Sequence, residues 1–226
     1  MGTLSDRRDS VTDAPPALMT GRITNVEIFA PTFFEYLLAR SVRPVVPVRH
    51  VGMRLARWDS QTDDGLVILC GLAGALTEDL RPGDVVIPEE TSFEGGAVRS
   101  MNADLVDALR ASARILGYAQ RHGRLLTASG LVTGADRAVW SNRGFVAADM
   151  EAALLPEESR VAVVRVILDA PDRSISSDWT SPARAVVDRQ RWHEMHWMVR
   201  YAPVFARRAA LIASVAAREI VGAPSN

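Results

Sequence analysis

Cysteine, net charge and long apolar runs are all scarce in this sequence of 226 residues. Cys70 is the single cysteine, which excludes an intrachain disulfide framework and a cysteine zinc cluster. Lys and Arg number 26 against 27 Asp and Glu, so no polybasic field is available to bind nucleic acid. No apolar run reaches 18 residues, and the first residues lack the apolar core of a signal peptide. We therefore expect a cytoplasmic protein that acts on a small molecule.

The length and the even composition predict one folded domain. A chain of this size can bury one sizeable α/β core. Residues 1–20 are polar and contain proline, which predicts a disordered leader. Residues 21–226 are expected to form a single domain that ends in a helical tail. The tail helix is predicted over 181–221, with a break at Pro203.

Apolar runs of strand length alternate with segments of helical periodicity. The predicted strands lie at 23–30, 65–76, 84–88 and 160–169, and the predicted helices lie at 31–42 and 102–117. Gly71 and Gly74 interrupt the second of these strands, which predicts a tight turn there. This alternation predicts an α/β fold with a central mixed sheet flanked by helices in a three-layer sandwich. Ligands of such folds bind beyond the ends of the strands.

Three stretches of the sequence carry a resemblance to a known family. They are "VILCGLAGALTEDLRPGDVVIPE", "FVAADMEAALL" and "VVRVILDAPDR". In this order and spacing they resemble the nucleoside phosphorylase and methylthioadenosine (S-adenosylhomocysteine) nucleosidase superfamily. The motifs "GADRAV", "ADMEAA" and "DAPDRSI" are most similar to its hopanoid-associated phosphorylase branch, which is connected with the release of adenine from adenosylhopane.

The resemblance implies an enzyme that needs no cofactor and cleaves the N-ribosidic bond of an adenosine-type nucleoside with a bulky or apolar 5′ substituent. Negative charge builds on the departing purine, so an acid must protonate it. The resemblance gives this role to Asp169, although Leu168 stands where relatives often have Ser. It also implies that Glu151 binds the two ribose hydroxyls, that Met150 forms an apolar surface beneath the sugar, and that Asp149 makes a further substrate contact. An acidic first helical turn is the alternative interpretation of this D-M-E stretch.

The nucleophile can be water or phosphate. Glu35 in "APTFFEY" stands where methylthioadenosine nucleosidases carry a glutamate that positions water, and an exposed helix glutamate is the alternative interpretation. Phosphate would need cationic or amide donors, for which Arg54 and Arg165 are candidates. The segment "FAPTFF" offers no glycine-rich phosphate cradle, so we prefer hydrolysis. A phosphorylase with the same contacts and a non-catalytic nucleoside-binding homologue are the two alternatives.

The glycine-rich stretch and two later positions complete the candidate site. Gly71, Ala73 and Gly74 would let the backbone approach the ribose or the nucleophile, although a plain tight turn needs the same residues. Asp136 in "GADRAV" is either a substrate contact or a helix cap. Phe145 is a candidate to stack on the purine, and Trp140 could replace it.

The tail "RQRWHEMHWMVRYAPVF" mixes aromatic, Met and Arg residues. Such a helix can lie on a membrane or accept a lipid-like substrate tail, but packing onto the sheet or onto a partner subunit is the favoured interpretation. His193 and His196 lack a third ligand, so we expect no metal site. The resemblance also implies a homo-oligomer, with a dimer favoured.

Overall fold

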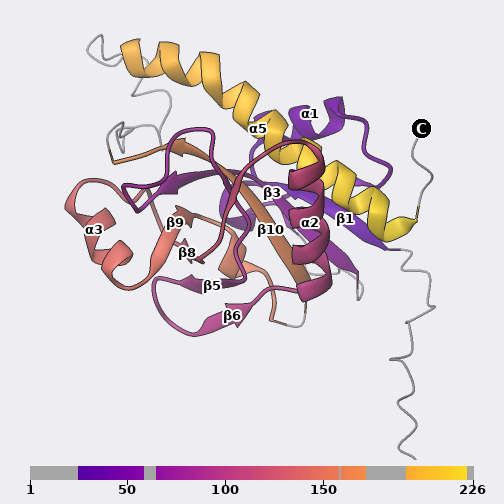
Figure 1. Cartoon of the computed structure of the whole chain (residues 1–226), viewed down its shortest axis with the longest axis horizontal. Coiled ribbons are helices and arrows are strands. Elements are labelled where there is room, and N and C mark those ends of the chain that lie inside the picture. Colours follow the sequence, from indigo (N-terminus) through magenta and orange to yellow (C-terminus); the bar gives the residue numbers. More distant parts are fainter. Residues whose placement is uncertain (1–24, 59–64, 158, 172–191, 223–226) are drawn as a thin grey trace, which may run out of the picture.

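One mixed sheet organises the part of the chain that the computed structural model describes, which is residues 25–58, 65–157, 159–171 and 192–222 (Figure 1). The expected leader at 1–20 and the first part of the expected tail helix lie outside these residues. The ten strands are β1 (Val26–Ala30), β2 (Val48–His50), β3 (Leu66–Ala75), β4 (Val85–Val86), β5 (Glu90–Phe93), β6 (Val98–Ser100), β7 (Gln120–Arg121), β8 (Arg124–Thr127), β9 (Phe145–Asp149) and β10 (Arg160–Asp169).

The described helices lie between and beside these strands. They are α1 (Phe33–Ser41), α2 (Ala103–Ile115), α3 (Ala135–Asn142) and α5 (Trp192–Val221), with short 3-10 turns η1 (Met53–Leu55) and η2 (Ala152–Leu154). The expected α/β fold with a central mixed sheet flanked by helices is confirmed. None of the helices in the described ranges is long and apolar enough to cross a bilayer.

Two long parallel strands, β3 and β10, form the middle of the sheet. Their sequences are almost wholly apolar, and their side chains are buried on both faces, as is typical of parallel strands covered by helices. The order of strands is β6-β5-β8-β9-β3-β10-β4-β7, and β1 pairs with the first half of β3 and with β2. The register places Asp169 opposite Gly74, across an irregularity in β10. The carboxyl ends of both central strands therefore meet at one edge of the sheet.

The helices α1 and α2 both pack against α5, which covers the centre of the sheet. α5 lies across β3 and β10 and contacts both α1 and α2 (Figure 1). Its sheet-facing side is rich in alanine, which lets the helix approach the strands closely. Asn102 caps α2, as predicted, because its side chain accepts a hydrogen bond of 3.1 Å from the amide of Leu105.

Two local predictions are wrong. β3 continues through Gly71 and Gly74 as one extended strand, so these glycines do not make a tight turn. They are needed instead because side chains from neighbouring elements approach the strand there. α5 continues through Pro203, and the buried Ala202 and Phe205 beside the proline hold this part of the helix against the protein. That packing offsets the loss of one backbone hydrogen bond.

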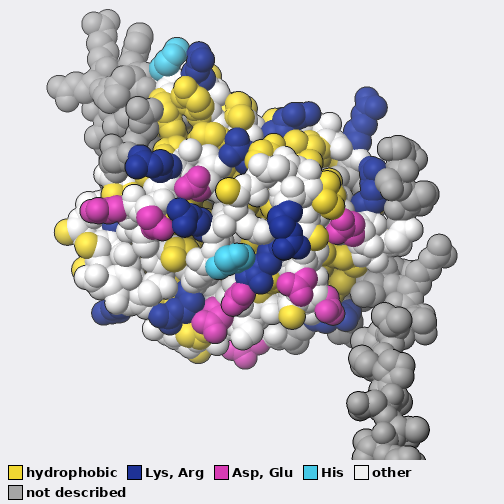
Figure 2. All heavy atoms as spheres, viewed as in Figure 1, with side chains coloured by type: hydrophobic (Ala, Val, Ile, Leu, Met, Phe, Trp, Pro, Cys, Tyr) yellow, Lys and Arg dark blue, Asp and Glu magenta, His cyan; other side chains and the backbone are white. Residues whose placement is uncertain are grey.

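Charged side chains of both signs are interspersed on the face shown in Figure 2, and no continuous field of one sign covers it. The apolar side chains visible there gather mainly around the helical part of the molecule. This face therefore has none of the basic character that binding to a polyanion requires.

The only cysteine of the sequence should be inert in the folded protein. Burial raises the pKa of the Cys70 thiol to about 12, so the reactive thiolate is scarce at neutral pH. We expect no reaction with a coloured disulfide reagent at pH 8 until urea unfolds the chain, and then one equivalent per chain. Fast labelling of the native protein at one equivalent would contradict this burial.

Candidate active site

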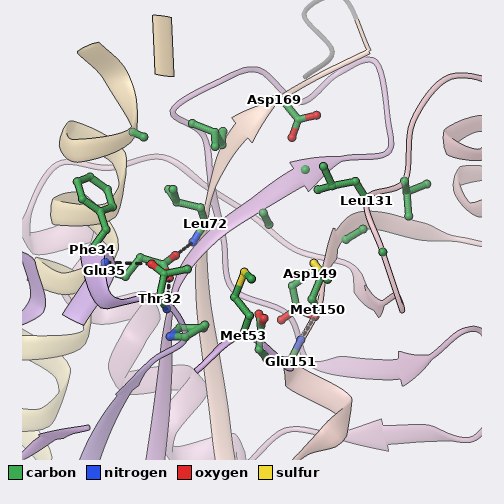
Figure 3. A pocket seen from close by; sticks show the side chains of 18 of the residues that line it. Thr32, Phe34, Glu35, Met53, Leu72, Leu131, Asp149, Met150, Glu151 and Asp169 are labelled. Atoms are coloured by element: carbon green, nitrogen blue, oxygen red, sulfur yellow. Dashed lines mark hydrogen bonds between the residues drawn. The ribbon is translucent and has the colours of Figure 1, made fainter. Parts of the chain in front are cut away.

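A cavity of about 470 Å³ lies where β3, β9 and β10 end (Figure 3). Its wall is mostly apolar, and four carboxyl groups line it, those of Glu35, Asp149, Glu151 and Asp169. All four of these residues are buried. This size, and a few polar groups in an apolar wall, are typical of a small-molecule site. The fold thus brings acids from positions 35 to 169 to one cavity.

Glu35 joins the start of α1 to the middle of β3. Thr32 caps α1, and its amide and hydroxyl donate to Oε2 of Glu35 at 2.9 and 2.8 Å. The amide of Leu72 donates to the other oxygen, Oε1, at 2.8 Å. A carboxylate can accept about four hydrogen bonds, so Oε1 keeps acceptor capacity beyond these three. Glu35 is therefore fixed by its cap yet still able to orient a further donor.

Gly71 provides the space in which Glu35 and Arg165 approach β3. A Cβ atom built on Gly71 would lie 2.5 Å from Oε1 of Glu35 and 2.6 Å from Nη1 of Arg165. A Cβ atom does not approach a non-bonded oxygen or nitrogen this closely, so one of the groups would have to shift. Gly71 does not line the cavity itself, so its contribution is the room it leaves for these two charged groups.

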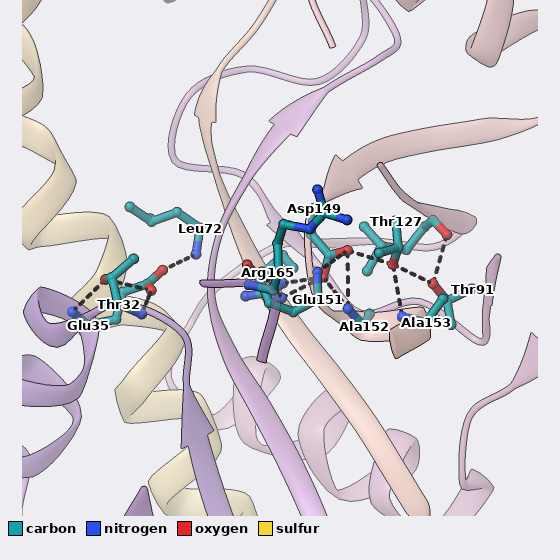
Figure 4. A network of polar contacts seen from close by, with 12 residues as sticks. Thr32, Glu35, Leu72, Thr91, Thr127, Asp149, Glu151, Ala152, Ala153 and Arg165 are labelled. Carbon is teal, nitrogen blue, oxygen red and sulfur yellow. Dashed lines mark hydrogen bonds and ion pairs between the residues drawn. The ribbon is translucent and has the colours of Figure 1, made fainter. Parts of the chain in front are cut away.

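Arg165 is fully buried in the middle of β10 and pairs with two acids (Figure 4). Its Nη2 donates to Oδ2 of Asp149 at 2.5 Å and to Oε2 of Glu151 at 3.2 Å, and its Nε donates to Asp149 at 3.1 Å. These acids raise the pKa of the guanidinium against the opposing effect of burial. Its Nη1 has no hydrogen-bond partner among the described residues. One buried donor thus remains next to Gly71 and Glu35.

Asp149 directs its carboxylate mainly toward protein donors. Besides the two bonds from Arg165, it accepts from the hydroxyl of Thr127 at 2.8 Å and from the amide of Ala152 at 3.1 Å (Figure 4). The amide of Glu151 adds a longer bond of 3.3 Å. Asp149 was predicted to contact the substrate. In the structure its oxygens are largely occupied, and they orient Arg165 and the backbone that carries Glu151.

Glu151 keeps more of its acceptor capacity and faces the cavity (Figure 3). Its two oxygens accept one bond from Arg165 and one of 3.2 Å from the amide of Arg54, whose backbone is left-handed with φ 53°. Burial is the largest cause that raises the pKa of Glu151, to about 7; Arg165 opposes the rise and Asp149 adds to it. An ionised carboxylate can accept about four hydrogen bonds, so Glu151 can also accept from both hydroxyls of a ligand diol.

Asp169 ends β10 and is held by a residue that the sequence analysis did not select. Nη2 of Arg137, on α3, donates to Oδ2 of Asp169, and both side chains are almost completely buried. The other oxygen of Asp169 lies close to Gly74, where an added Cβ would be 2.9 Å from it. The motif "GADRAV" was the available signal, but the pattern alone did not tell which residue of its D-R pair points inward.

Besides Gly71, two predicted residues do not line the cavity. Asp136 is exposed on the first turn of α3, because the helical rotation that buries Arg137 turns its neighbour outward. Phe145 is buried in a separate apolar cluster and meets Trp140 edge to face, with ring centroids 5.8 Å apart. Phe145 is the first residue of β9, whereas Ala148 and Asp149, which line the cavity, lie at the other end of this strand.

Met150, Ala73 and Gly74 do line the cavity. Around them lies an apolar rim that the sequence analysis did not identify, formed by Phe34, Met53 and Leu131 (Figure 3). These three side chains line the cavity and are also exposed. α5 adds Met198 and Ala202 to the wall. Within the described residues no three His, Cys, Asp or Glu side chains are placed to hold a metal ion.

Comparisons with known proteins identify a family and a fold. Residues 60–178 match the sequence profile of the phosphorylase superfamily. A comparison with curated protein sequences found no match. Among solved structures, the chain is similar to a 5′-methylthioadenosine/S-adenosylhomocysteine nucleosidase from Neisseria meningitidis in complex with methylthio-immucillin-A. That likeness has 16% identity and a TM-score of 0.67, and covers 86% of this chain and 99% of the other.

Two Helicobacter pylori structures are similar to the same extent. A 5′-methylthioadenosine/S-adenosylhomocysteine nucleosidase has 12% identity and a TM-score of 0.68, with 88% of this chain and 100% of the other covered. Futalosine hydrolase has 12% identity and a TM-score of 0.66, with 87% and 98% covered. At such low identities the likeness shows a shared fold.

Replacing Gly71 with alanine should disrupt the meeting of Glu35 and Arg165. The added methyl would overlap with both groups, and overpacking of this kind costs about 1–3 kcal/mol of unfolding free energy. Gly130→Ala is the matched control, because an added Cβ there meets nothing within 4 Å. Urea unfolding of both variants measures the difference. Equal stability of the two variants would show that the space at Gly71 is not needed.

The raised pKa of Glu151 predicts a pH dependence of stability. The folded chain holds this proton up to about pH 7, whereas an ordinary glutamate releases it near 4.5. The stabilisation is therefore fully present below about pH 4.5 and is lost as the pH rises through 7. Between pH 4.5 and 8 the free energy of unfolding of wild type should fall by on the order of 3 kcal/mol relative to that of Glu151→Gln. Urea unfolding at both pH values measures this gain.

The exposed Glu78 provides the control for this measurement. Glu78→Gln removes one charge without any change in the cavity, and it should follow wild type at both pH values. A pH-independent difference between Glu151→Gln and wild type would contradict the burial effect.

Proposed function

Because the chain belongs to the phosphorylase superfamily, we propose that it hydrolyses the N-ribosidic bond of a purine nucleoside and releases the free base. Membership confirms the expectation of an enzyme of the nucleosidase and phosphorylase type. The observation that carries the proposal is the convergence of Glu35, Glu151 and Asp169 on one apolar cavity of about 470 Å³ (Figure 3). Acids on different elements can serve the base, the sugar and the nucleophile separately.

The proposed reaction uses one carboxyl group for each part of the substrate. Asp169 gives its proton to a ring nitrogen of the purine as the bond from C1′ to the base breaks and its electron pair moves to the base. Glu151 accepts both ribose hydroxyls, and its negative charge favours the cationic sugar that forms. Water adds to C1′ and transfers a proton to Glu35. These roles resemble those the superfamily gives to the matching residues.

The polar groups near Glu35 favour water over phosphate. The amide of Leu72 is already bonded to Glu35, and most donors of Arg165 are bonded to Asp149 and Glu151. The side chain of Arg54 donates to the carbonyl of Ser129 at 2.8 Å. A phosphate would be repelled by the negative charge of Glu35 and would find only Nη1 of Arg165 as a buried donor. A water molecule can form hydrogen bonds with both groups. Hydrolysis therefore remains preferred over the phosphorylase alternative.

The apolar rim supports the proposed 5′ substituent. Phe34, Met53 and Leu131 line the cavity and reach the surface, so a bulky apolar group attached to the ribose could extend along them. Leu72 and Leu168 add to the apolar wall, and Leu168 stands where relatives often have Ser. We propose an adenosine derivative of this type, as in the hopanoid-associated branch. The homodimer and the cytoplasmic location also stay predictions.

The first test is an assay of base release. The purified enzyme is incubated with adenosine, methylthioadenosine, S-adenosylhomocysteine and an apolar 5′-alkyl adenosine, each with and without phosphate, and free adenine is followed by chromatography. We expect release without phosphate, fastest for the apolar 5′ groups. Asp169→Asn should lower the rate about 10²- to 10⁴-fold, as is typical for loss of a general acid.

Asp104→Asn is the matched control, since Asp104 is exposed on α2 and far in sequence from the cavity residues. It should leave the rate unchanged. Release that requires phosphate would establish the phosphorylase alternative and exclude the water-positioning role of Glu35. Binding of nucleosides without any release would favour the non-catalytic homologue.

A further inference from the structure

A buried guanidinium contacts the carboxyl group of the proposed acid. Nη2 of Arg137 donates to Oδ2 of Asp169, and Nη1 donates to the carbonyl of Ala75 at 2.5 Å. The two side chains are only 4% and 11% exposed. Arg137 therefore joins the ends of β3 and β10 from α3, and it holds Asp169 in one orientation beside the cavity.

The segment that carries Arg137 is also part of the cavity wall. Residues 130–132 line the cavity, and α3 begins three residues later. Gly134, at the start of α3, has a left-handed φ of 54° and provides no side-chain cap. Arg137 is the buried residue of this short helix. A base that binds against residues 130–132 would thus lie beside the segment that positions Asp169.

The charges around Asp169 act in opposite directions. A guanidinium at hydrogen-bond distance favours the carboxylate over the carboxylic acid, more strongly when water is excluded. Among the described residues, the other charged side chains that line this cavity or pair with its acids are Glu35 of α1, Asp149 and Glu151 at the end of β9, and Arg165 of β10. The three acids favour a protonated Asp169, and Arg165 is largely engaged by two of them.

We propose that Arg137 is the positioning residue of the reaction, which orients Asp169 and stabilises the carboxylate that forms when Asp169 gives its proton to the departing base. This inference rests on the proposed function. The attraction between Arg137 and Asp169 grows as the proton leaves, so it is stronger in the transition state than before it. Arg137 thereby makes Asp169 a stronger acid, which speeds proton transfer. It also lowers the fraction of enzyme in which Asp169 carries its proton.

Two kinetic consequences separate this role from simple structural support. At low pH, where Asp169 carries its proton with or without Arg137, the neutral variant Arg137→Gln should be about tenfold slower or more. At higher pH, kcat falls as Asp169 loses its proton, and in Arg137→Gln this fall should occur about one pH unit or more above that of wild type. A residue that only supports the fold would lower the rate without moving this fall.

The experiment is the pH profile of kcat for base release from the fastest substrate, between pH 4.5 and 9, with wild type, Arg137→Gln and Arg137→Lys. The lysine variant keeps the positive charge, so its profile should fall at the wild-type pH even if its rate is lower. Arg143→Gln is the matched control: Arg143 is exposed at the other end of α3, and its loss should change neither rate nor profile. Thermal unfolding checks that each variant is folded.

A second measurement does not depend on activity. Carbon-13 NMR of enzyme labelled at the aspartate carboxyl carbons, with Asp169→Asn to identify the signal, follows the titration of Asp169 directly. We expect its midpoint to be higher in Arg137→Gln than in wild type. Equal midpoints, or an equal pH profile, would overturn the proposal. No base release by wild type would refute the proposed function. If the midpoint of Asp169 still shifted in Arg137→Gln, the charge effect of Arg137 would be established independently of that function.

Discussion

The buried guanidinium of Arg165 is the constraint on which the candidate site depends. A cation in the middle of β10 is unfavourable without partners, because burial from water costs several kcal/mol. Asp149 and Glu151 compensate this charge, so the end of β9 must lie within reach of the Arg165 side chain, on the other side of β3. Thr127 and the amide of Ala152 then bind Asp149 and hold the backbone that presents Glu151. Removal of Asp149 would leave Arg165 with only its longer contact of 3.2 Å to Glu151, which ties the geometry of the cavity to the stability of the sheet.

The lack of a side chain at Gly71 and Gly74 of β3 is the second constraint. Gly71 leaves room for Glu35 and Arg165, and Gly74 leaves room for Asp169. One strand therefore satisfies two requirements. It is apolar enough to be buried, and its glycines leave space for three charged groups to approach. Around these groups the wall is apolar, which lowers the local dielectric and strengthens each electrostatic interaction with a bound ligand.

Much of the fold was predictable, because burial and periodicity are local properties of the sequence. The apolar runs predicted β3 and β10, the Asn102 cap predicted the start of α2, and alternation predicted an α/β sheet. The turn at Gly71 and Gly74 and the break at Pro203 were wrong, because a glycine or a proline permits several local structures and tertiary packing selects among them. Phe145 was a candidate to stack on the base, but it lies at the start of β9 in a separate apolar cluster, whereas the cavity lies at the end of this strand.

The sequence by itself determined the kinds of residue available at the site: acids that follow buried strands, glycines on β3, and a carboxylate in the first turn of α1. Only the tertiary structure decided which charges meet. Arg165 pairs with Asp149 and Glu151, and Arg137 rather than Asp136 turns toward Asp169. The physical reason is that these contacts join different elements. Their partners are set by strand order, register and helix rotation, which no local pattern of hydrophobicity encodes.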